Sequence, residues 1–355
     1  MVSSRQEVDS VSGSPARQAL GKQSIKFTSP VYLVNSASVV GKKEGEGPLG
    51  DAFDVVVKDD KDGFNTWEEA ESALQRDAVT TLLQKSGERT ENIRYLFAGD
   101  LLGQSIASTF GLMTFELPFI GLYGACSTCG LSLTLGSMAV AGGFAETVIC
   151  VTSSHYASAE KEFRFPLAYG NQRPLSASWT VTGSGAFLVS NQKKESVRAV
   201  ISGITTGKII DYGVKDSMNM GACMAPAAAD IILQHMKDFH AKPEDYDRII
   251  TGDLGIVGQE ILIDLLLQKD MNIEKQHMDC GIEIYDKTQD AHAGGSGCGC
   301  SAVVLSAYIL KQIENGTWKK VLFIPTGALL SKVSYNEGQA VPGVAHAIVL
   351  EHCCS

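Results

Sequence analysis

Cys126 is the residue of this sequence whose surroundings are best suited to a nucleophile. It lies among small residues at positions 121–130 (GLYGACSTCG), between an apolar segment and a run of small and apolar residues. We expect a strand, a turn and a helix here, with the thiol at the first helical turn, where unpaired N–H groups and the helix dipole stabilise a thiolate. The alternative is a small buried side chain, a common role for free cysteine. The position on a strand-to-helix turn favours a pocket location, although not necessarily a reactive thiol.

A second glycine-rich turn lies about 170 residues later and carries Ser296, Gly297 and Cys298. If the two turns face one another, these residues line the same crevice as Cys126. We therefore assign them, together with Cys126, as candidate ligand-binding residues.

The cysteine spacing also permits other chemistry. Cys126-x-x-Cys129 has the spacing of a redox motif, and with Cys298-x-Cys300 it could be imagined as a zinc site. Zinc binding requires the two turns to meet, and burial within a small-residue helix explains Cys129 more simply. No glycine-rich stretch combines a strand, Gly-x-Gly-x-x-Gly and a helix. We predict neither a metal nor a cofactor.

Two histidines and two arginines could assist a site at Cys126. His155 follows the expected strand 147–152 and could contact the thiol or a ligand, or equally serve as a hydrogen-bonded residue behind the pocket. His292 precedes the second glycine-rich turn and is a weaker candidate for a base. Arg164 and Arg173 follow His155 and could bind carboxylates in bidentate fashion, or could be surface residues.

The elements that position these residues follow an alternating strand and helix pattern. Thr66-Trp-Glu-Glu69 is a capping box that predicts a helix ending at Gly87, with Ala70, Leu74, Ala78 and Leu82 on its buried face. Residues 41–62 are charged and glycine-containing, and we interpret them as a surface insertion. The alternation predicts parallel strands covered by helices.

The pattern occurs twice. Residues 94–101 (RYLFAGDL) resemble residues 248–254 (RIITGDL), and a cysteine-bearing helix and another strand follow each of them. We infer a duplication, with a flexible extension at 1–21, one half at 22–198 and another at 199–355. The carboxyl ends of the strands should line a shared crevice.

Composition and charge argue against several classes of function. The net charge is -10 and no cluster of Lys and Arg is present, which argues against nucleic-acid binding. No apolar run approaches the roughly 20 residues needed to cross a bilayer, and the first residues lack a secretory signal. Nine cysteines, an odd number, indicate reduced thiols. We expect a soluble chain of the cytoplasmic type.

Several motifs resemble a known family. Gly124-Ala-Cys-Ser-Thr128 looks like the nucleophile turn of thiolases and ketoacyl synthases, and the segments 219–227 and 293–302 resemble other thiolase motifs. From about Gly21 to the last strand, the chain is more narrowly similar to the stage V sporulation protein AD family. That similarity also rests on the segments 152–155, 182–186, 224–230, 294–298 and 326–331.

This resemblance implies a fold and a function. The fold would be a thiolase-like α/β architecture, with two pseudo-symmetric βαβαβ halves in α/β/α/β/α layers, and a homodimer is expected by analogy. The function would be binding of dipicolinic acid (pyridine-2,6-dicarboxylate), alone or as its calcium chelate, during uptake into the developing spore. The partners would be membrane proteins of a transport complex, with peripheral association at the inner forespore membrane.

The same resemblance leaves catalysis doubtful. Ketoacyl synthases carry a His where this chain has Asp253, and an Asn where it has residues 295–297. A carboxylate at an oxyanion position repels the developing charge. The sequence thus favours ligand binding. One alternative is an active acyltransferase with Cys126 as nucleophile and His155 or His292 as base, and another is a scaffold with an empty relic pocket.

Overall fold

The computed structural model describes residues 18–163, 172–195 and 197–353 of the chain. The strands of the first half are β1 (Ala19–Leu20), β2 (Ser24–Lys26), β3 (Tyr32–Val40), β4 (Val55–Val56), β5 (Tyr95–Gly99), β6 (Phe119–Gly121), β7 (Thr147–Ser154), β8 (Trp179–Thr180) and β9 (Gly183–Ser190). Its helices are α1 (Lys42–Gly45), α2 (Trp67–Ser86), α3 (Ile106–Leu112), α4 (Thr128–Ala141) and α5 (Tyr156–Phe163).

The second half contains a similar succession of strands and helices. Its strands are β10 (Ala199–Thr206), β11 (Arg248–Thr251), β12 (His277–Asp279), β13 (Gly295–Ser296), β14 (Lys320–Ile324), β15 (Thr326–Ala328) and β16 (Gly343–Glu351). Its helices are α6 (Met220–Phe239), α7 (Gly255–Leu267), α8 (Cys280–Glu283), α9 (Cys298–Val304), α10 (Leu310–Glu314) and α11 (Lys332–Asn336). A π-helical turn, η9 (Leu305–Ile309), joins α9 to α10.

The strand order confirms the duplicated α/β fold. From one edge inward the first half runs β6-β5-β7-β9-β3, and the second runs β12-β11-β14-β16-β10. In both, the three outer strands are parallel, and the other neighbours are antiparallel. The halves are not separate sheets, however, because β10 pairs with β3 at Ala199↔Leu33 and Val200↔Tyr32.

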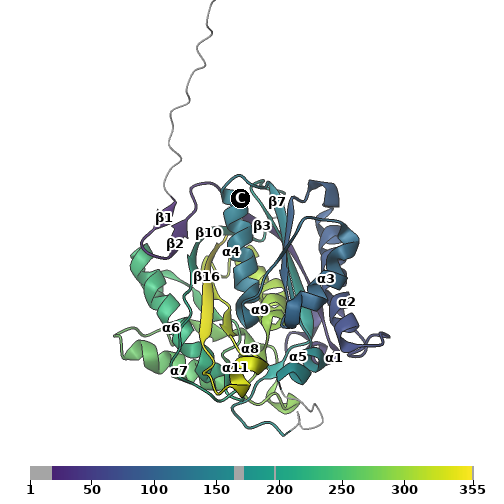
Figure 1. The fold of residues 1–355 in the computed structure, drawn as a ribbon. Coiled ribbons are helices and arrows are strands. Elements are labelled where there is room, and N and C mark those ends of the chain that lie inside the picture. The colour runs from purple at the N-terminus through teal and green to yellow at the C-terminus, as the bar shows by residue number, and fades with distance from the viewer. Residues whose placement is uncertain (1–17, 164–171, 196, 354–355) are drawn as a thin grey trace, which may run out of the picture.

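The helices form three layers around the two halves of the sheet. α2 and α3 cover the first half, α6 and α7 cover the second, and α4 and α9 lie between them (Figure 1). A helix between two sheets must be apolar or small on every side. In α4, a Cβ atom added to Gly136 would come within 2.6 Å of Cys150 Sγ. This explains the small-residue composition of the helix that follows Cys126.

The local prediction for α2 is confirmed. Thr66 accepts a hydrogen bond from the backbone N–H of Glu69 and completes a capping box, and Gly87 ends the helix at a φ of 62°. The expected face is buried. At the other end of the chain's first segment, Ala19 and Leu20 form a strand paired with β2, so the part of the extension that the structure describes is not all coil.

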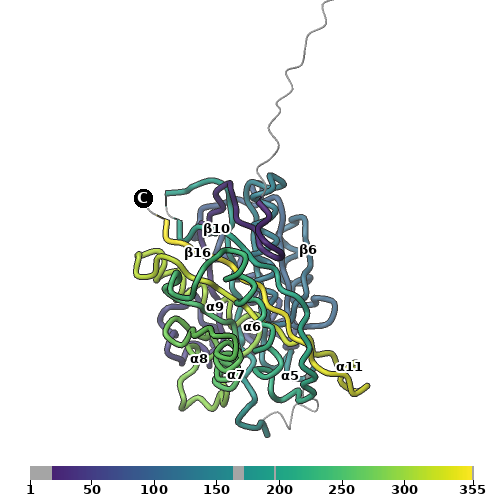
Figure 2. The backbone as a smooth tube through the Cα atoms, turned by 90° about the vertical axis from the view of Figure 1, so that its left-hand side faces the viewer, coloured from purple at the N-terminus to yellow at the C-terminus, as the bar shows by residue number. Residues whose placement is uncertain are grey.

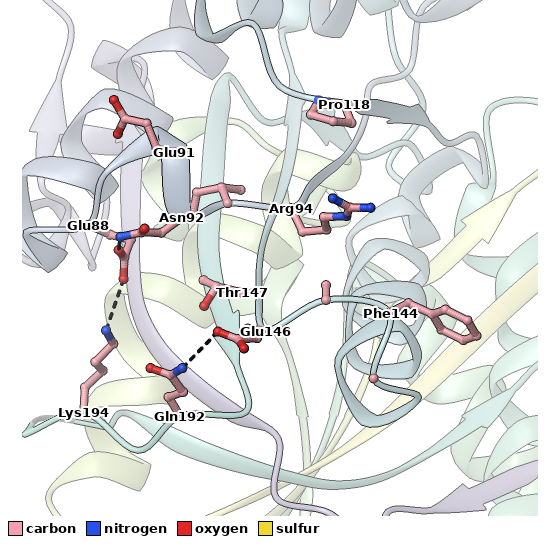
Figure 3. Close-up of a pocket in the computed structure, with 13 residues that line it drawn as sticks. Glu88, Glu91, Asn92, Arg94, Pro118, Phe144, Glu146, Thr147, Gln192 and Lys194 are labelled. Carbon is pink, nitrogen blue, oxygen red and sulfur yellow. Dashed lines mark hydrogen bonds and ion pairs between the residues drawn. The ribbon is translucent and has the colours of Figure 1, made fainter. Parts of the chain in front are cut away.

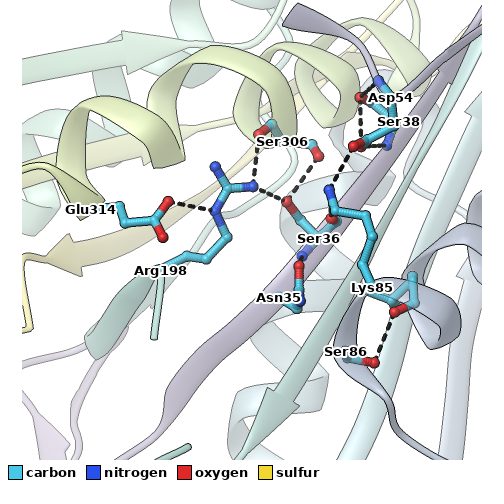
Figure 4. A network of polar contacts seen from close by, with 10 residues as sticks. Asn35, Ser36, Ser38, Asp54, Lys85, Ser86, Arg198, Ser306 and Glu314 are labelled. Carbon is cyan, nitrogen blue, oxygen red and sulfur yellow. Dashed lines mark hydrogen bonds and ion pairs between the residues drawn. The ribbon is translucent and has the colours of Figure 1, made fainter. Parts of the chain in front are cut away.

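Most of residues 41–62 lie at the surface, as predicted for an insertion, but a few of them reach the core. Glu44 is 1% exposed and Phe53 lies in the main hydrophobic core. The segment returns to the sheet at Asp54, whose carboxylate accepts from the Ser38 N–H and from Lys85 Nζ (Figure 4). The charged and glycine-rich composition did not reveal these buried residues, because only a few residues of the segment point inward.

A polar network ties the two halves together near the place where β10 meets β3. Arg198 donates to Ser36 Oγ at 2.7 Å and to the carbonyl oxygen of Ser306 at 3.1 Å, and forms an ion pair with Glu314 at 3.2 Å (Figure 4). Ser306 lies in the π-helical turn η9. The network thus joins β3 of the first half to η9 and α10 of the second.

At the lower end of the molecule, α11 projects from the body close to α5 (Figure 2). Lys332 of α11 lies 3.7 Å from Glu162 of α5, so a salt bridge links these elements of the two halves. The same end of the molecule holds the crevice described next.

Candidate functional site

The Cys126 turn is a short 3-10 turn, η5 (Ala125–Ser127), that leads into α4. Ala125 has a φ of 50°, which side chains other than glycine rarely adopt. Such strain persists only where neighbouring structure holds it. Here β15 packs against the turn so closely that a Cβ on Gly327 would lie 2.3 Å from the carbonyl oxygen of Gly124. The turn is therefore rigidly held by the second half.

A small pocket opens over the Cys126 side chain. Its volume is about 30 Å³, close to the share of one water molecule in the liquid. Both halves contribute its lining, which consists of Leu101, Ala125, Cys126, Ser178, Thr180, Met220, Ser296, Ala328 and Leu330. The structure thus brings together Cys126 and Ser296 from opposite walls, with Sγ and Oγ 3.9 Å apart.

Asp253 holds the second wall in place. Its carboxylate accepts from the Ser296 hydroxyl at 3.0 Å, from the Gly297 N–H at 2.8 Å and from the Thr326 hydroxyl at 3.1 Å. The side chain is 1% exposed. Burial raises the pKa of Asp253 to about 7, because it outweighs the hydrogen bonds from Gly297 and Ser296, which lower the pKa. Sequence reasoning treated Asp253 only as an obstacle to catalysis and missed its role in positioning the wall.

The electrostatics at Cys126 are opposite to those expected from its helix position. Burial and, next, the Asp253 carboxylate raise the pKa of the Cys126 thiol well above its usual value. The helix dipole is worth about 1 kcal/mol at a helix terminus, which is too little to offset burial beside a carboxylate. Cys126 is therefore held as a thiol, with its Sγ 3.9 Å from Ser296 Oγ.

A second carboxylate, Asp279, fixes the loop that carries Asp253. It accepts from the backbone N–H groups of Leu254 and Gly255 at 2.9 and 3.0 Å and from the Thr251 hydroxyl at 2.6 Å. It also caps α8. The N-cap position of Asp279 before α8 is the sequence signal that could have revealed it.

Neither candidate histidine lines this pocket. His155 is fully buried, and its Nε2 bonds the carbonyl oxygen of Asp60 at 2.7 Å, whereas its Nδ1 accepts from the Ala157 N–H at 3.1 Å. Burial lowers the pKa of His155. His292 contacts the carbonyl oxygen of Pro174 at 2.8 Å and the carboxylate of Asp290 at 3.0 Å. Both rings are therefore engaged by other groups.

The other predicted site residues lie away from the pocket or outside the described part of the chain. Arg164 lies outside the described residues. Arg173 is 7% exposed and donates to the carbonyl oxygens of Asp290 and Ser178, at 2.8 and 3.4 Å. Cys298 is fully buried behind the pocket and its Sγ donates to the carbonyl oxygen of Ser153 at 2.9 Å. Both cysteine-bearing turns reach the pocket, but of Cys126 and Cys298 only Cys126 lines it.

Two further buried carboxyl groups lie behind Cys298. Glu71 accepts from the hydroxyls of Ser153 and Ser158, at 2.8 and 2.6 Å, and Asp100 accepts from the Ser108 hydroxyl at 2.6 Å. Burial, followed by the negative charge of Asp100, raises the pKa of Glu71 to about 8. The crevice is thus backed by carboxyl groups on both sides of Cys126.

A larger and more open hollow than the Cys126 pocket lies elsewhere. It has a volume of about 640 Å³ and surrounds the amino ends of β5 and β7 (Figure 3). Two of its charged groups, Lys194 and Glu88, pair with one another at 3.3 Å. Ligands of α/β sheets bind at the carboxyl ends of the strands, so this open hollow is a weaker candidate than the Cys126 pocket. Among the described residues, no group of three or more His, Cys, Asp or Glu side chains could hold a metal ion.

Comparison with known proteins identifies the family. The family model of stage V sporulation protein AD matches residues 21–351. The chain is also 41% identical to stage V sporulation protein AD of Bacillus subtilis (strain 168) over 331 residues, covering 93% of this chain and 97% of that protein. The chain belongs to the stage V sporulation protein AD family. It is thus a sporulation protein with a thiolase-like fold.

Solved structures agree on the fold of this family member. The human mitochondrial 3-ketoacyl-CoA thiolase in complex with CoA superposes with a TM-score of 0.57 at 12% identity, over 93% of this chain and 99% of that one. The 3-oxoacyl-[acyl-carrier-protein] synthase III of Aquifex aeolicus gives 0.54 at 12% identity, over 90% and 99%. In the described part of the family member, no helix is both long and apolar enough to span a membrane.

Proposed function

We propose that this protein binds dipicolinic acid and supports its uptake into the developing spore without catalysing a reaction. The observation that carries the proposal is the burial of Cys126 beside Asp253. The nucleophile turn keeps its position between the two halves, but burial and, next, the Asp253 carboxylate raise the pKa of its thiol. A family of sporulation proteins that retains the fold and replaces its reactive partners is suited to binding a ligand.

The crevice has features that suit a planar dicarboxylate. Its walls combine apolar side chains such as Leu101 and Met220 with the hydroxyls of Ser178, Thr180 and Ser296. Ligand sites commonly combine apolar walls with a few oriented polar groups. The volume of about 30 Å³ is far below the few hundred Å³ of typical ligand pockets, so binding requires the lining side chains to separate.

Calorimetric titration with dipicolinic acid tests the proposal, with and without calcium. Benzene-1,3-dicarboxylate is the matched ligand control, since it keeps the carboxylate geometry and lacks the ring nitrogen. We expect saturable binding of dipicolinate and weaker binding of the control. A folded wild-type protein that gives no binding signal with dipicolinate, in either condition, contradicts the proposal.

Incubation with acyl-CoA followed by intact mass measurement tests the catalytic alternative. We expect no acyl adduct on the wild type, because acyl transfer to cysteine needs a thiolate. An adduct that disappears in Cys126→Ala would replace the binding proposal by an acyltransferase.

We further propose that the protein works as a homodimer beside membrane proteins of a transport complex, peripherally at the inner forespore membrane. β6 is the edge strand of the first half. Exposed apolar side chains lie on β6 and on residues 106–113, among them Phe110 (64%), Met113 (67%), Phe119 (45%) and Ile120 (36%). An apolar edge strand is a template for pairing with a second copy. Phe119→Glu should give a monomer in sedimentation equilibrium, whereas Phe144→Glu, exposed by 73% elsewhere, should not.

Membrane fractions of sporulating cells, washed with high salt, test the peripheral location. We expect the protein to pellet with membranes and to be released by the wash. Recovery only in the soluble fraction before washing contradicts the location.

A further inference from the structure

Ser296 lines the Cys126 pocket with a hydroxyl that already donates to a carboxylate. β8 pairs in parallel with β13 where Thr180 lies opposite Ser296, and both residues line the pocket. Trp179, the other residue of β8, points to the opposite face, because neighbouring residues of a strand alternate. On the pocket face, the Ser296 hydroxyl donates to the Asp253 carboxylate at 3.0 Å. A hydroxyl has a single hydrogen, so it cannot donate to Asp253 and to a ligand at the same time.

The charge of Asp253 changes with pH near neutrality. The side chain is 1% exposed, and burial raises its pKa to about 7. The titratable groups around it are Asp279 at the end of β12 and the thiols of Cys126, Cys280 and Cys300, from η5, α8 and α9. The pKa of each thiol lies well above its ordinary value, so the thiols stay neutral, and the charge of Asp279 raises the pKa of Asp253 further. Hydroxyl and N–H donors, rather than a cation, hold the Asp253 carboxylate.

An ionised Asp253 opposes a ligand carboxylate in this pocket in two ways. It repels the negative charge of the ligand in a buried place, where charges are only weakly screened. It also keeps the Ser296 hydroxyl as its own donor, because hydrogen bonds to a charged acceptor are the stronger ones. A proton on Asp253 removes the repulsion and leaves a weaker, neutral acceptor. The hydroxyl can then donate to the ligand.

We propose that a carboxylate of an aromatic dicarboxylate binds at the Ser296 hydroxyl only when Asp253 carries a proton, so that binding takes up one proton. The proton passes from the buffer to the Asp253 carboxylate, and the hydroxyl changes its acceptor from Asp253 to the ligand. The inference rests on the proposed function for the identity of the ligand, and it adds that pH controls the affinity. The protein thus binds its ligand at lower pH and releases it at higher pH.

The direction of the pH dependence follows from two ionisations. Free carboxyl groups have a pKa of about 4, so both carboxylates of the ligand stay ionised above about pH 6. Below a pH of about 7, Asp253 is protonated before the ligand arrives, and binding takes up little. Above that pH, each bound ligand takes up one proton, and the affinity falls by up to about tenfold for each pH unit.

Calorimetric titration of the full-length wild type with dipicolinate measures both quantities. Repeating the titration in two buffers of different ionisation enthalpy gives the number of protons taken up per ligand. We expect about one proton at pH 8.5 and about a tenth of one at pH 6, with an affinity at least about tenfold weaker at pH 8.5. Binding with no proton uptake and no pH dependence overturns this inference and leaves the proposed function intact. No binding at any pH overturns the proposed function itself.

Asp253→Asn identifies the group that takes up the proton. We expect this variant to bind more tightly than wild type at pH 8.5, with no proton uptake and little pH dependence. Glu71→Gln and Glu44→Gln are the matched controls, since burial raises the pKa of these carboxyl groups to about 8 and about 7. We expect both controls to take up the proton as wild type does. Loss of the uptake in either control, or its persistence in Asp253→Asn, overturns the inference.

Ser296→Ala tests the hydroxyl separately from the charge. It removes the donor and leaves Asp253 in place, so we expect binding at pH 6 to weaken by about tenfold, as for the loss of one charge-assisted hydrogen bond. Wild-type affinity in this variant at pH 6 overturns the role of Ser296 as the donor to the ligand. This variant and the proton count on the wild type keep the inference open to disproof even if Asp253→Asn does not fold.

Discussion

The two faces of the short β8–β13 ladder carry opposite charge. On one face, Asp253 lies against Cys126 and accepts three hydrogen bonds, and burial keeps its pKa near 7. On the other face, Lys43 and Arg173 contact Trp179. The ladder therefore separates a carboxyl-lined pocket from a cationic cluster.

The two faces thus differ in the kind of group that they carry: buried carboxyl groups near Cys126, and positive side chains at Trp179. The acidic face is fully satisfied by backbone and hydroxyl donors, as expected of groups that hold a structure together. On the other face, Lys43 and Arg173 contact the same indole ring. We therefore expect substitutions of the buried acidic groups to affect stability.

Asp279→Ala should give the largest loss of stability. The substitution leaves the N–H groups of Leu254 and Gly255 and the Thr251 hydroxyl without their acceptor in a buried place. We expect a loss of about 3 kcal/mol or more in the free energy of unfolding, measured by urea denaturation. Asp77→Ala, at a half-exposed residue of α2, is the control and should change stability by less than about 0.5 kcal/mol. Equal effects of the two would show that the acidic face is not structural.

Glu71 should make stability fall as pH rises. The folded protein raises the pKa of Glu71 to about 8, above the ordinary value of a glutamate, so folding favours the protonated form. Its contribution is complete below the ordinary value and is lost as pH rises toward 8, with a slope of at most about 1.4 kcal/mol per pH unit. Glu71→Gln mimics the protonated group and should flatten the dependence between pH 5 and 8. Asp253 and Glu44, each with a pKa of about 7, sustain the remaining slope.

If Glu71→Gln proved as pH-dependent as the wild type, Glu71 would be ionised in the folded state. Glu69→Gln, on the exposed turn of the same helix, controls for removal of a charge from α2. Its carboxylate belongs to the capping box, so a small, pH-independent loss of stability is expected there.

The sequence anticipated the parts of this comparison that depend on local or repeated patterns. The capping box at Thr66 predicts α2, and the similar segments 94–101 and 248–254 predict the duplicated sheet, because each of these signals is carried by residues that are close together in the sequence. Cys126 and Ser296 were placed on facing walls from the duplication alone. The contact between Lys43 and Trp179 was missed, since the two residues are far apart in sequence and no local pattern records their meeting.

The chemistry at Cys126 could not be predicted for a related reason. A helix start favours a thiolate, and that rule was correct for an isolated turn. The decisive opposing group, Asp253, arrives from the other half of the chain and is itself held by Asp279. Only the packed structure establishes that burial and a neighbouring carboxylate outweigh the dipole.

Asp253→Asn should make Cys126 more reactive. The amide keeps the shape of the carboxylate but removes the charge that, after burial, raises the pKa of the Cys126 thiol. We expect the rate of iodoacetamide labelling at Cys126 to rise by about tenfold at pH 8, as for a shift of one pKa unit. Peptide mass spectrometry measures it, with Cys223 in the same protein as an internal reference. A rate that is unchanged at Cys126, in a variant that is folded, would mean that burial alone controls the thiol.

Lys43→Met should have the smallest effect on stability. The half-buried ammonium loses its contact with Trp179 and a hydrogen bond to a carbonyl oxygen, and the protein loses the repulsion from Arg173. These terms oppose each other, so we expect the unfolding free energy to change by less than about 1 kcal/mol. Urea denaturation without ligand measures it, with Lys42→Met as the matched control, since Lys42 is exposed on the same helix. A loss as large as that of Asp279→Ala would mean that both faces of the ladder are structural.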